Sequence, residues 1–240
     1  MTAPAVRWLG NSDIIRHILT ADPNACKPAY SLGPPAQTPA PPGTPVARYR
    51  SLAAFQDGLT AATLDPRYHW VLYDPEADTP QFTGTPTAEQ QDPWTWLPRF
   101  GQYAHAHGYR VIAAPARDLG NVDGSRYPKL ATEDISRWYV RTGVVSAAAQ
   151  NADIVSIQSQ ALTEDVKAYE TFVAVTKDQA QRENPYVKVF AGISTRYGTA
   201  AQMAAAARSV HVDGYWLNVP GPAPDIAKAV EFLRLMTGGT

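Results

Sequence analysis

Two acidic residues stand two positions apart where an apolar segment ends, in the run Tyr73-Asp74-Pro75-Glu76. Side chains alternate along a strand, so Asp74 and Glu76 are expected on one side of it and Tyr73 on the other. Mutual repulsion and partial burial should raise the pKa of one carboxyl group, which leaves a neutral acid beside an anion. This is the ordinary way to make a general acid, and we predict Glu76 as the general acid/base with Asp74 as its partner. A solvated loop with a capping Asp74 is the alternative.

Matched polar side chains follow two further apolar segments. Gln158 and Gln160 come directly after the segment 154–157, and Trp216 and Asn218 alternate in the last such segment. Amides both donate and accept hydrogen bonds, which suits the hydroxyl groups of a sugar, and a Trp ring offers a flat apolar face for stacking. We predict these four residues as substrate contacts. An internal amide network and core packing of Trp216 are the alternatives.

A positive and a negative side chain follow the segment Arg110–Ala114. Arg117 is predicted either to bind a carboxylate or to hold Asp118 and the acidic pair in place, and a local ion pair between Arg117 and Asp118 fits the sequence equally well. Asp118 and Tyr73 complete the predicted substrate contacts. Candidate hydrogen-bonding groups without a recognisable motif follow a further segment: Ser194, Thr195 and Arg196.

One pattern repeats along most of the chain: a short β-branched run, a polar loop and then an amphipathic stretch. Nearly continuous apolar runs of this length are typical of parallel strands that are covered on both faces. The predicted strands are Val6–Leu9, Val46–Arg50, Trp70–Tyr73, Arg110–Ala114, Asp153–Ile157, Val187–Ile193 and Val212–Val219.

Helix signals alternate with these strands. A helix is predicted from Asn11 to about Thr20, and apolar residues recur at helical spacing from Ile135 to Val145. The runs 132–134 and 163–165, each Thr-Glu-Asp, place capping side chains and acids at the starts of two helices.

Seven strand–helix units in 240 residues imply one parallel sheet, either open or closed. We predict an α/β fold with a closed (β/α)8-type (TIM) barrel, regular or irregular, in which one strand is unrecognised. The glycine-rich phosphate loops that would favour an open, doubly wound sheet do not occur in the sequence. In either sheet, ligand-binding residues lie at the C-terminal ends of the strands.

Residues 1–240 are predicted to form a single barrel domain. The proline-rich stretch 31–45 has no periodicity and is predicted to be a surface loop or linker. A peptide ligand for a proline-recognising module and a lid over the site are the alternatives.

Composition argues against several classes of function. Lys and Arg total 21 against 22 Asp and Glu, a net charge of -1, so nucleic acid is not an expected partner. No apolar run approaches the ~20 residues that cross a bilayer, so no membrane association is expected. No signal peptide is visible, and we expect a cytoplasmic protein, or a secreted one if a signal has been removed. The sequence does not fix the oligomeric state.

No cofactor and no metal ion are expected. Cys26 is the single cysteine, which excludes a multi-cysteine zinc site, and the histidines lack the H-x-x-x-H spacing. A divalent ion held by Asp74, Glu76 and Asp118 is the alternative.

The run that contains Asp74 and Glu76 resembles the end of the D-x-x-D-x-D-x-E signature of family 18 glycoside hydrolases, the chitinase-type barrels. His69 and Leu72 stand where that pattern has its two earlier aspartates. The resemblance implies that Glu76 is the general acid, that Asp74 orients the substrate and that Trp216 forms the floor of a sugar subsite. More broadly, the chain resembles glycoside-hydrolase-like barrels from about Val46 to Thr237, without a close family of assigned activity.

Together these features favour an acid/base enzyme that acts on a polar, carbohydrate-like substrate, most simply a glycoside hydrolase. Two other classes use the same residues. One is a lyase, cyclase or isomerase that acts on a small metabolite, and the other is a non-catalytic barrel that binds a ligand.

Overall fold

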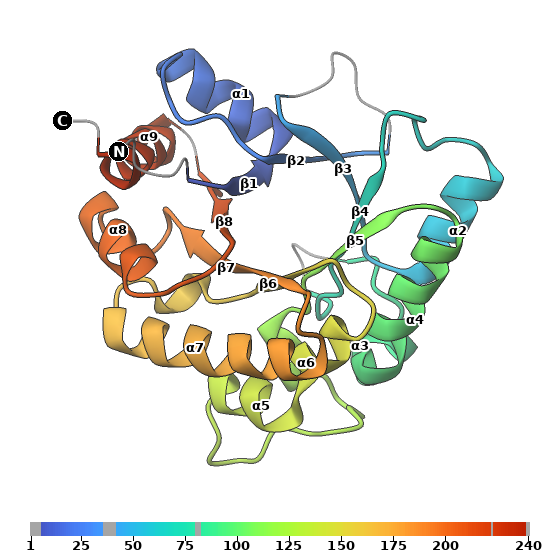
Figure 1. The fold of residues 1–240 in the computed structure, drawn as a ribbon. Helices are drawn as coiled ribbons and strands as arrows, with labels where there is room; N and C mark the ends of the chain where they lie inside the picture. Colours follow the sequence, from blue (N-terminus) through green and yellow to red (C-terminus); the bar gives the residue numbers. More distant parts are fainter. Residues whose placement is uncertain (1–5, 36–41, 80–82, 222, 239–240) are drawn as a thin grey trace.

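The computed structural model describes residues 6–35, 42–79, 83–221 and 223–238, and in it eight parallel strands close into a barrel. The strands follow one another around the barrel in chain order, and the last pairs with the first, so the predicted (β/α)8 barrel is confirmed (Figure 1). The strands are β1 (Trp8–Asn11), β2 (Tyr30–Gly33), β3 (Thr44–Tyr49), β4 (Trp70–Tyr73), β5 (Arg110–Ala113), β6 (Ile154–Ile157), β7 (Lys188–Ser194) and β8 (Gly214–Asn218).

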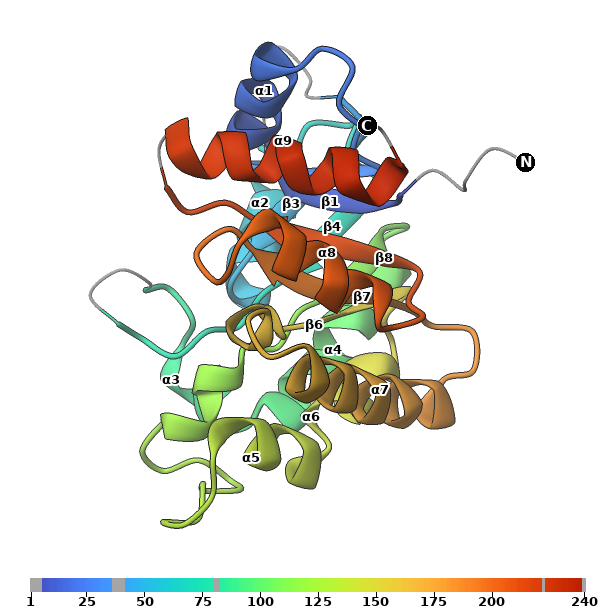
Figure 2. The same cartoon turned by 90° about the vertical axis from the view of Figure 1, so that its left-hand side faces the viewer.

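Helices cover the outside of this barrel. In the side view of Figure 2, α1, α9, α8 and α7 lie one after another across the strands. No helix in the described part of the chain is long and apolar enough to span a bilayer. The helices are α1 (Ser12–Ala21), α2 (Leu52–Thr60), α3 (Thr87–Gln91), α4 (Pro93–Ala106), α5 (Ile135–Thr142), α6 (Val144–Ala149), α7 (Val166–Glu183), α8 (Ala200–Arg208) and α9 (Ala223–Thr237), with the 3-10 turns η1 (Arg117–Asn121) and η2 (Gln160–Leu162).

The eighth strand, unrecognised in the sequence, is β2. It begins with Tyr30, which is in register with Leu9 of β1 and Thr44 of β3. The stretch 31–45, predicted as a loop or linker, therefore needs a correction. Its first three residues belong to β2 and its last two to β3, so it connects neighbouring strands of one barrel, and residues 36–41 lie outside the described residues.

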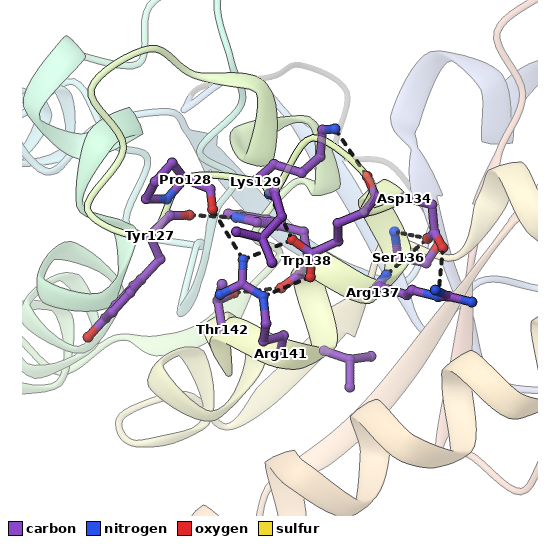
Figure 3. A network of polar contacts seen from close by, with 12 residues as sticks. Tyr127, Pro128, Lys129, Asp134, Ser136, Arg137, Trp138, Arg141 and Thr142 are labelled. Atoms are coloured by element: carbon purple, nitrogen blue, oxygen red, sulfur yellow. Dashed lines mark hydrogen bonds and ion pairs between the residues drawn. The ribbon is translucent and has the colours of Figure 1, made fainter.

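The helix predicted through Val145 is divided in two. Asp134 caps the start of α5, where its carboxylate accepts hydrogen bonds from the backbone N–H groups of Ser136 (2.8 Å) and Arg137 (3.0 Å), as Figure 3 shows. Gly143 then adopts a left-handed conformation with φ +64°, which ends α5 before α6 begins. A residue with a Cβ would be strained there, so the glycine accounts for the break.

The interior of the barrel is apolar along most of the strands and polar at their C-terminal ends. Tyr30 packs edge-on against Trp70 (5.1 Å between ring centroids) and Phe190 (6.0 Å). Strand alternation places the next inward positions two residues further along, and at the C-terminal ends these positions are polar. The buried apolar residues of the interior are Leu9, Tyr30, Leu32, Val46, Leu72, Ile112, Ala114, Ile154, Phe190 and Trp216.

Gly214 tests how tightly this interior is packed. It is in register with Phe190 of the neighbouring strand, and a Cβ on Gly214 would lie 2.6 Å from the Phe190 ring. We expect Gly214→Ala to lower the free energy of unfolding by about 1–3 kcal/mol, because overpacking forces a fully buried ring to move. Urea unfolding measures this loss, and an unchanged midpoint would show that the ring moves without cost.

Candidate functional site

A cavity of about 940 Å³ opens at the C-terminal ends of the strands. This is the end where TIM-barrel enzymes carry their active sites. Every strand, or the loop that follows it, contributes to the wall. The residues that the argument below uses are Asn11, Arg48, Glu76, Arg117, Asp118, Gln158, Gln160, Arg196, Tyr197, Trp216 and Asn218.

The acidic pair lies at two depths in this wall. Asp74 is fully buried and does not line the cavity, whereas the Glu76 side chain is 16% exposed and does. The Arg48 guanidinium contacts both carboxylates, at very short range to Asp74 and at 3.4 Å to Glu76. Arg50 forms a second ion pair with Glu76 at 3.2 Å. Asp74 thus lies beneath the surface of the cavity, and Glu76 faces into the cavity.

The loop after β4 fixes the backbone that carries Glu76. The Glu76 N–H donates to the Thr85 hydroxyl at 3.1 Å, and the Gln90 amide donates to the Thr85 carbonyl at 2.6 Å. Gln90 also accepts a hydrogen bond from the Asp78 N–H at 3.1 Å. Because Thr85 and Gln90 are buried, this part of the loop is preorganised, and the carboxyl group has a defined position.

Burial and the nearby Asp74 carboxylate raise the pKa of Glu76 from 4.5 to about 7, against the opposing effect of Arg48 and Arg50. Burial also raises the pKa of Asp74, and Arg48 opposes this shift. Asp74 makes the closer contact with Arg48, so it ionises first and Glu76 keeps the shared proton near neutral pH. Within the pair, Glu76 is therefore the candidate proton donor and Asp74 the candidate anion.

The two glutamines form a chain across the floor. The Gln160 amide donates to Gln158 Oε1 at 2.8 Å, and Gln158 Nε2 lies 3.5 Å from Asp74 Oδ1. Gly192 makes room for this chain, because a Cβ there would lie 2.5 Å from the Gln160 side chain. Both amides line the cavity, so the internal network and the ligand-facing position are present together.

Trp216 and Asn218 line the cavity from β8. Trp216 is 6% exposed and belongs to the interior apolar cluster, so most of its ring packs in the core while part of it borders the cavity. Asn218 is half-buried at the strand end, where its carbonyl accepts a hydrogen bond from the Thr195 N–H at 3.1 Å.

Arg117 and Asp118 line the cavity but do not pair with each other. Arg117 Nη1 donates to the Ser136 hydroxyl at 2.9 Å, and Asp118 Oδ1 accepts a hydrogen bond from the Ala77 N–H at 3.2 Å. The local Arg–Asp ion pair is therefore not formed. Burial raises the pKa of Asp118 and lowers that of Arg117.

Tyr73 is the one predicted substrate contact that lies away from the cavity. It is fully buried, its ring stacks on Phe100 at 4.4 Å, and its hydroxyl donates to Glu89. Strand alternation explains this correction, because Tyr73 points outward from the barrel when Asp74 points inward. Glu89 in turn accepts hydrogen bonds from the Leu52 N–H at the start of α2.

Arg48 and Arg50 are the main site residues that the sequence reasoning missed. They alternate with Val46 at the end of β3, so the period of two that marked Asp74 and Glu76 would also have placed both arginines on the inner side. Asn11, at the end of β1, is a further cavity residue with the same signal.

The Arg48 guanidinium lies where a cation between Asp74 and Glu76 would lie, which argues against the alternative of a divalent ion at these carboxylates. Among the residues that the structure describes, no group of three or more His, Cys, Asp or Glu side chains is arranged to hold a metal ion.

Comparison with known proteins supports the fold. No protein-family model matches the chain, and the search of curated proteins finds no match. Among solved structures, a GH128 (subgroup III) curdlan-specific exo-beta-1,3-glucanase from Blastomyces gilchristii is similar, with a TM-score of 0.55 and 12% identity over 98% of this chain and 99% of that one. Hydroxymethylglutaryl-CoA lyase from Pseudomonas aeruginosa also has a TM-score of 0.55, with 15% identity over 91% of this chain and 77% of that one. The predicted resemblance to glycoside-hydrolase-like barrels is confirmed for the fold.

Tyr73→Phe separates a structural from a substrate-binding role at that position. The variant removes the hydroxyl and leaves the buried Glu89 carboxylate with one donor fewer, so we expect a loss of about 1–3 kcal/mol in the free energy of unfolding. Ligand affinity should not change, because Tyr73 does not line the cavity. Chemical denaturation and ligand titration measure the two effects, and weaker binding at unchanged stability would contradict this assignment.

Proposed function

We propose that this protein is a glycoside hydrolase-like enzyme that uses acid/base catalysis on a carbohydrate substrate bound in the 940 Å³ cavity. The observation that carries the proposal is Glu76, a cavity-lining carboxyl group whose pKa is about 7. A general acid works best when its pKa lies near the operating pH, and Glu76 meets this condition.

Hydrolysis of a glycoside needs two carboxyl groups. Glu76 protonates the oxygen of the leaving group as the bond to the anomeric carbon breaks, and a second carboxylate either activates water or attacks the anomeric carbon. Asp74 is too deeply buried for this second role, whereas Asp118 lines the cavity and its charge contributes to the raised pKa of Glu76. We assign the second role to Asp118, and to Asp74 the role of holding Arg48 and adjusting the pKa of Glu76.

The remaining wall suits a sugar. Gln158, Gln160 and Asn218 offer donors and acceptors for hydroxyl groups, and Trp216 offers an apolar edge beside them. The GH128 enzyme of similar fold was solved in complex with glucose, so a hexose is a reasonable first probe for this cavity.

Substitution of Glu76 tests the assignment through the leaving group. Glu76→Gln should lower kcat by about 10²–10⁴-fold on glycosides with an unactivated sugar as leaving group, since the lost proton donor acts in the transition state. Glycosides of an acidic phenol need little protonation and should lose much less. Asp118→Asn should slow both substrates alike, because it acts on the anomeric carbon.

The matched control is Glu183→Gln, an exposed residue at the end of α7, which should leave both rates unchanged. Release of reducing ends from a panel that includes β-1,3-gluco-oligosaccharides gives the rates. Unchanged turnover in Glu76→Gln would remove the proposal. Conversion of a small metabolite without release of reducing ends would favour a lyase, cyclase or isomerase, and binding without any turnover would favour a binding protein.

The pH profile gives an independent check. The acid must be protonated to act, so kcat/KM should fall as the pH rises through about 7, the pKa of Glu76. In Glu76→Gln this basic limb should be absent from the residual activity on the activated phenyl glycoside. A basic limb that persists in the variant would assign the titration to another group.

A further inference from the structure

Two arginines line the cavity without a direct ion pair to a carboxylate in the described part of the chain. Arg117 opens η1 after β5, and Arg196 lies in the loop after β7. Neither guanidinium forms an ion pair with a carboxylate among the residues that the structure describes. Tyr197 also lines the cavity and lies close enough to Arg117 to interact with its charge.

Arg117 is held in place by neutral groups. Its guanidinium donates to the Ser136 hydroxyl at 2.9 Å and lies 5.7 Å from the centre of the Phe172 ring. Ser136 is itself fixed by the Asp134 cap of α5 (Figure 3). Burial lowers the pKa of Arg117, and the carboxylates of Asp134 and Asp118 oppose this shift without forming an ion pair with it. The fold thus orients this cation through a neutral hydrogen bond and a ring contact and leaves its guanidinium without a direct carboxylate partner.

The backbone of the loop that carries Arg196 is held by hydrogen bonds, whereas the Arg196 side chain has no ion pair among the described residues. Lys228 of α9 donates to the carbonyls of Thr195 (2.6 Å) and Gly198 (3.0 Å), and the Gly198 N–H donates to Glu164 at 2.9 Å. The Arg196 side chain is exposed at the cavity and makes only a distant contact with the Tyr197 ring at 5.9 Å. A tethered loop with an uncommitted guanidinium is suited to receive a ligand group.

The other charges of the cavity are already engaged. Arg48 binds Asp74 and Glu76, and Asp13 pairs with Arg16 at 2.8 Å. One oxygen of Asp118 accepts a hydrogen bond from the Ala77 N–H, and its charge forms no ion pair with Arg117. Between the ends of β5 and β7 the wall therefore carries two guanidinium groups, Arg117 and Arg196, against the single carboxylate of Asp118.

We propose that Arg117 and Arg196 form an anion subsite, and that the saccharide bound in the cavity is acidic. The oxygens of a uronic acid carboxylate, or of a phosphate ester, accept hydrogen bonds from two guanidinium groups in the same way. This inference rests on the proposed function, which makes the ligand a saccharide. The two arginines would hold the acidic group of that saccharide, and Glu76 would act on its glycosidic bond.

Free monosaccharides test the subsite in the unmodified protein, because they contain no glycosidic bond to cleave. Isothermal titration with glucuronate, glucose 6-phosphate and glucose should give at least about tenfold tighter binding for one or both acidic sugars, since hydrogen bonds to charged groups are the strong ones. The tighter of the two anions identifies the acidic group. Equal affinity for all three sugars, or no binding of either anion, overturns the proposal.

The variants are Arg117→Gln and Arg196→Gln, each of which should remove most of the preference for the acidic sugar. Arg196 is exposed, so its variant keeps the test valid if Arg117→Gln does not fold. The matched control is Arg110→Gln, which removes the same charge at the opposite end of β5 and should retain the preference. An equal loss in the control would mean that net charge, not a subsite, sets the affinity.

Failure of the subsite and failure of the enzyme assignment give different results. Preferential binding of the acidic sugar without turnover of any glycoside keeps the subsite and removes the hydrolase. Cleavage of neutral glycosides that depends on Glu76, with no preference for acidic sugars in the titrations, keeps the hydrolase and removes the subsite.

Discussion

The contact of Arg48 with both Asp74 and Glu76 is the interaction on which the site depends. Asp74 has no exposed surface, and a carboxylate at that depth would take up a proton unless a cation lay against it. With Arg48 in place, Asp74 stays charged and its field acts on Glu76 above it. Removal of one partner from such a buried pair typically costs about 3–5 kcal/mol, so the same contact links stability to chemistry.

The depth of each carboxyl group decides what it can do. Asp74 and Glu76 lie on the same side of one strand end. Because Glu76 comes two residues later, its side chain reaches the cavity wall, whereas solvent cannot reach the Asp74 side chain. Asp74 can therefore act only through neighbours, Arg48 on one side and Gln158 on the other. Glu76 is open to a ligand, and its loop is held by Thr85, so its proton is presented from a fixed position.

Short apolar runs that alternate with amphipathic stretches were enough to predict most of the barrel, and the period of two at the strand ends singled out the acidic pair. These signals did not reveal β2, because Tyr30–Gly33 contains no β-branched residue and runs directly into prolines, so its strand character comes from pairing with β1 and β3. Arg48 was missed for a related reason. A charged residue in a strand is normally read as facing water, although its alternation with Val46 places Arg48 on the inner side, where the closed barrel buries it against Asp74.

The positions that sequence predicts least well are those where distant segments meet. The orientation of Arg117 depends on Ser136 and Phe172, which follow it by 19 and 55 residues, and no local pattern relates these side chains. Strand alternation could say that Arg117 lies near the mouth, but not that its natural partner Asp118 is engaged elsewhere. Because the scaffold supplies neutral contacts to this cation and fixes the loop of Arg196 through Lys228, the two guanidinium groups without direct ion pairs are a property of the folded cavity, and the acidic group of a ligand is the partner that we propose for them.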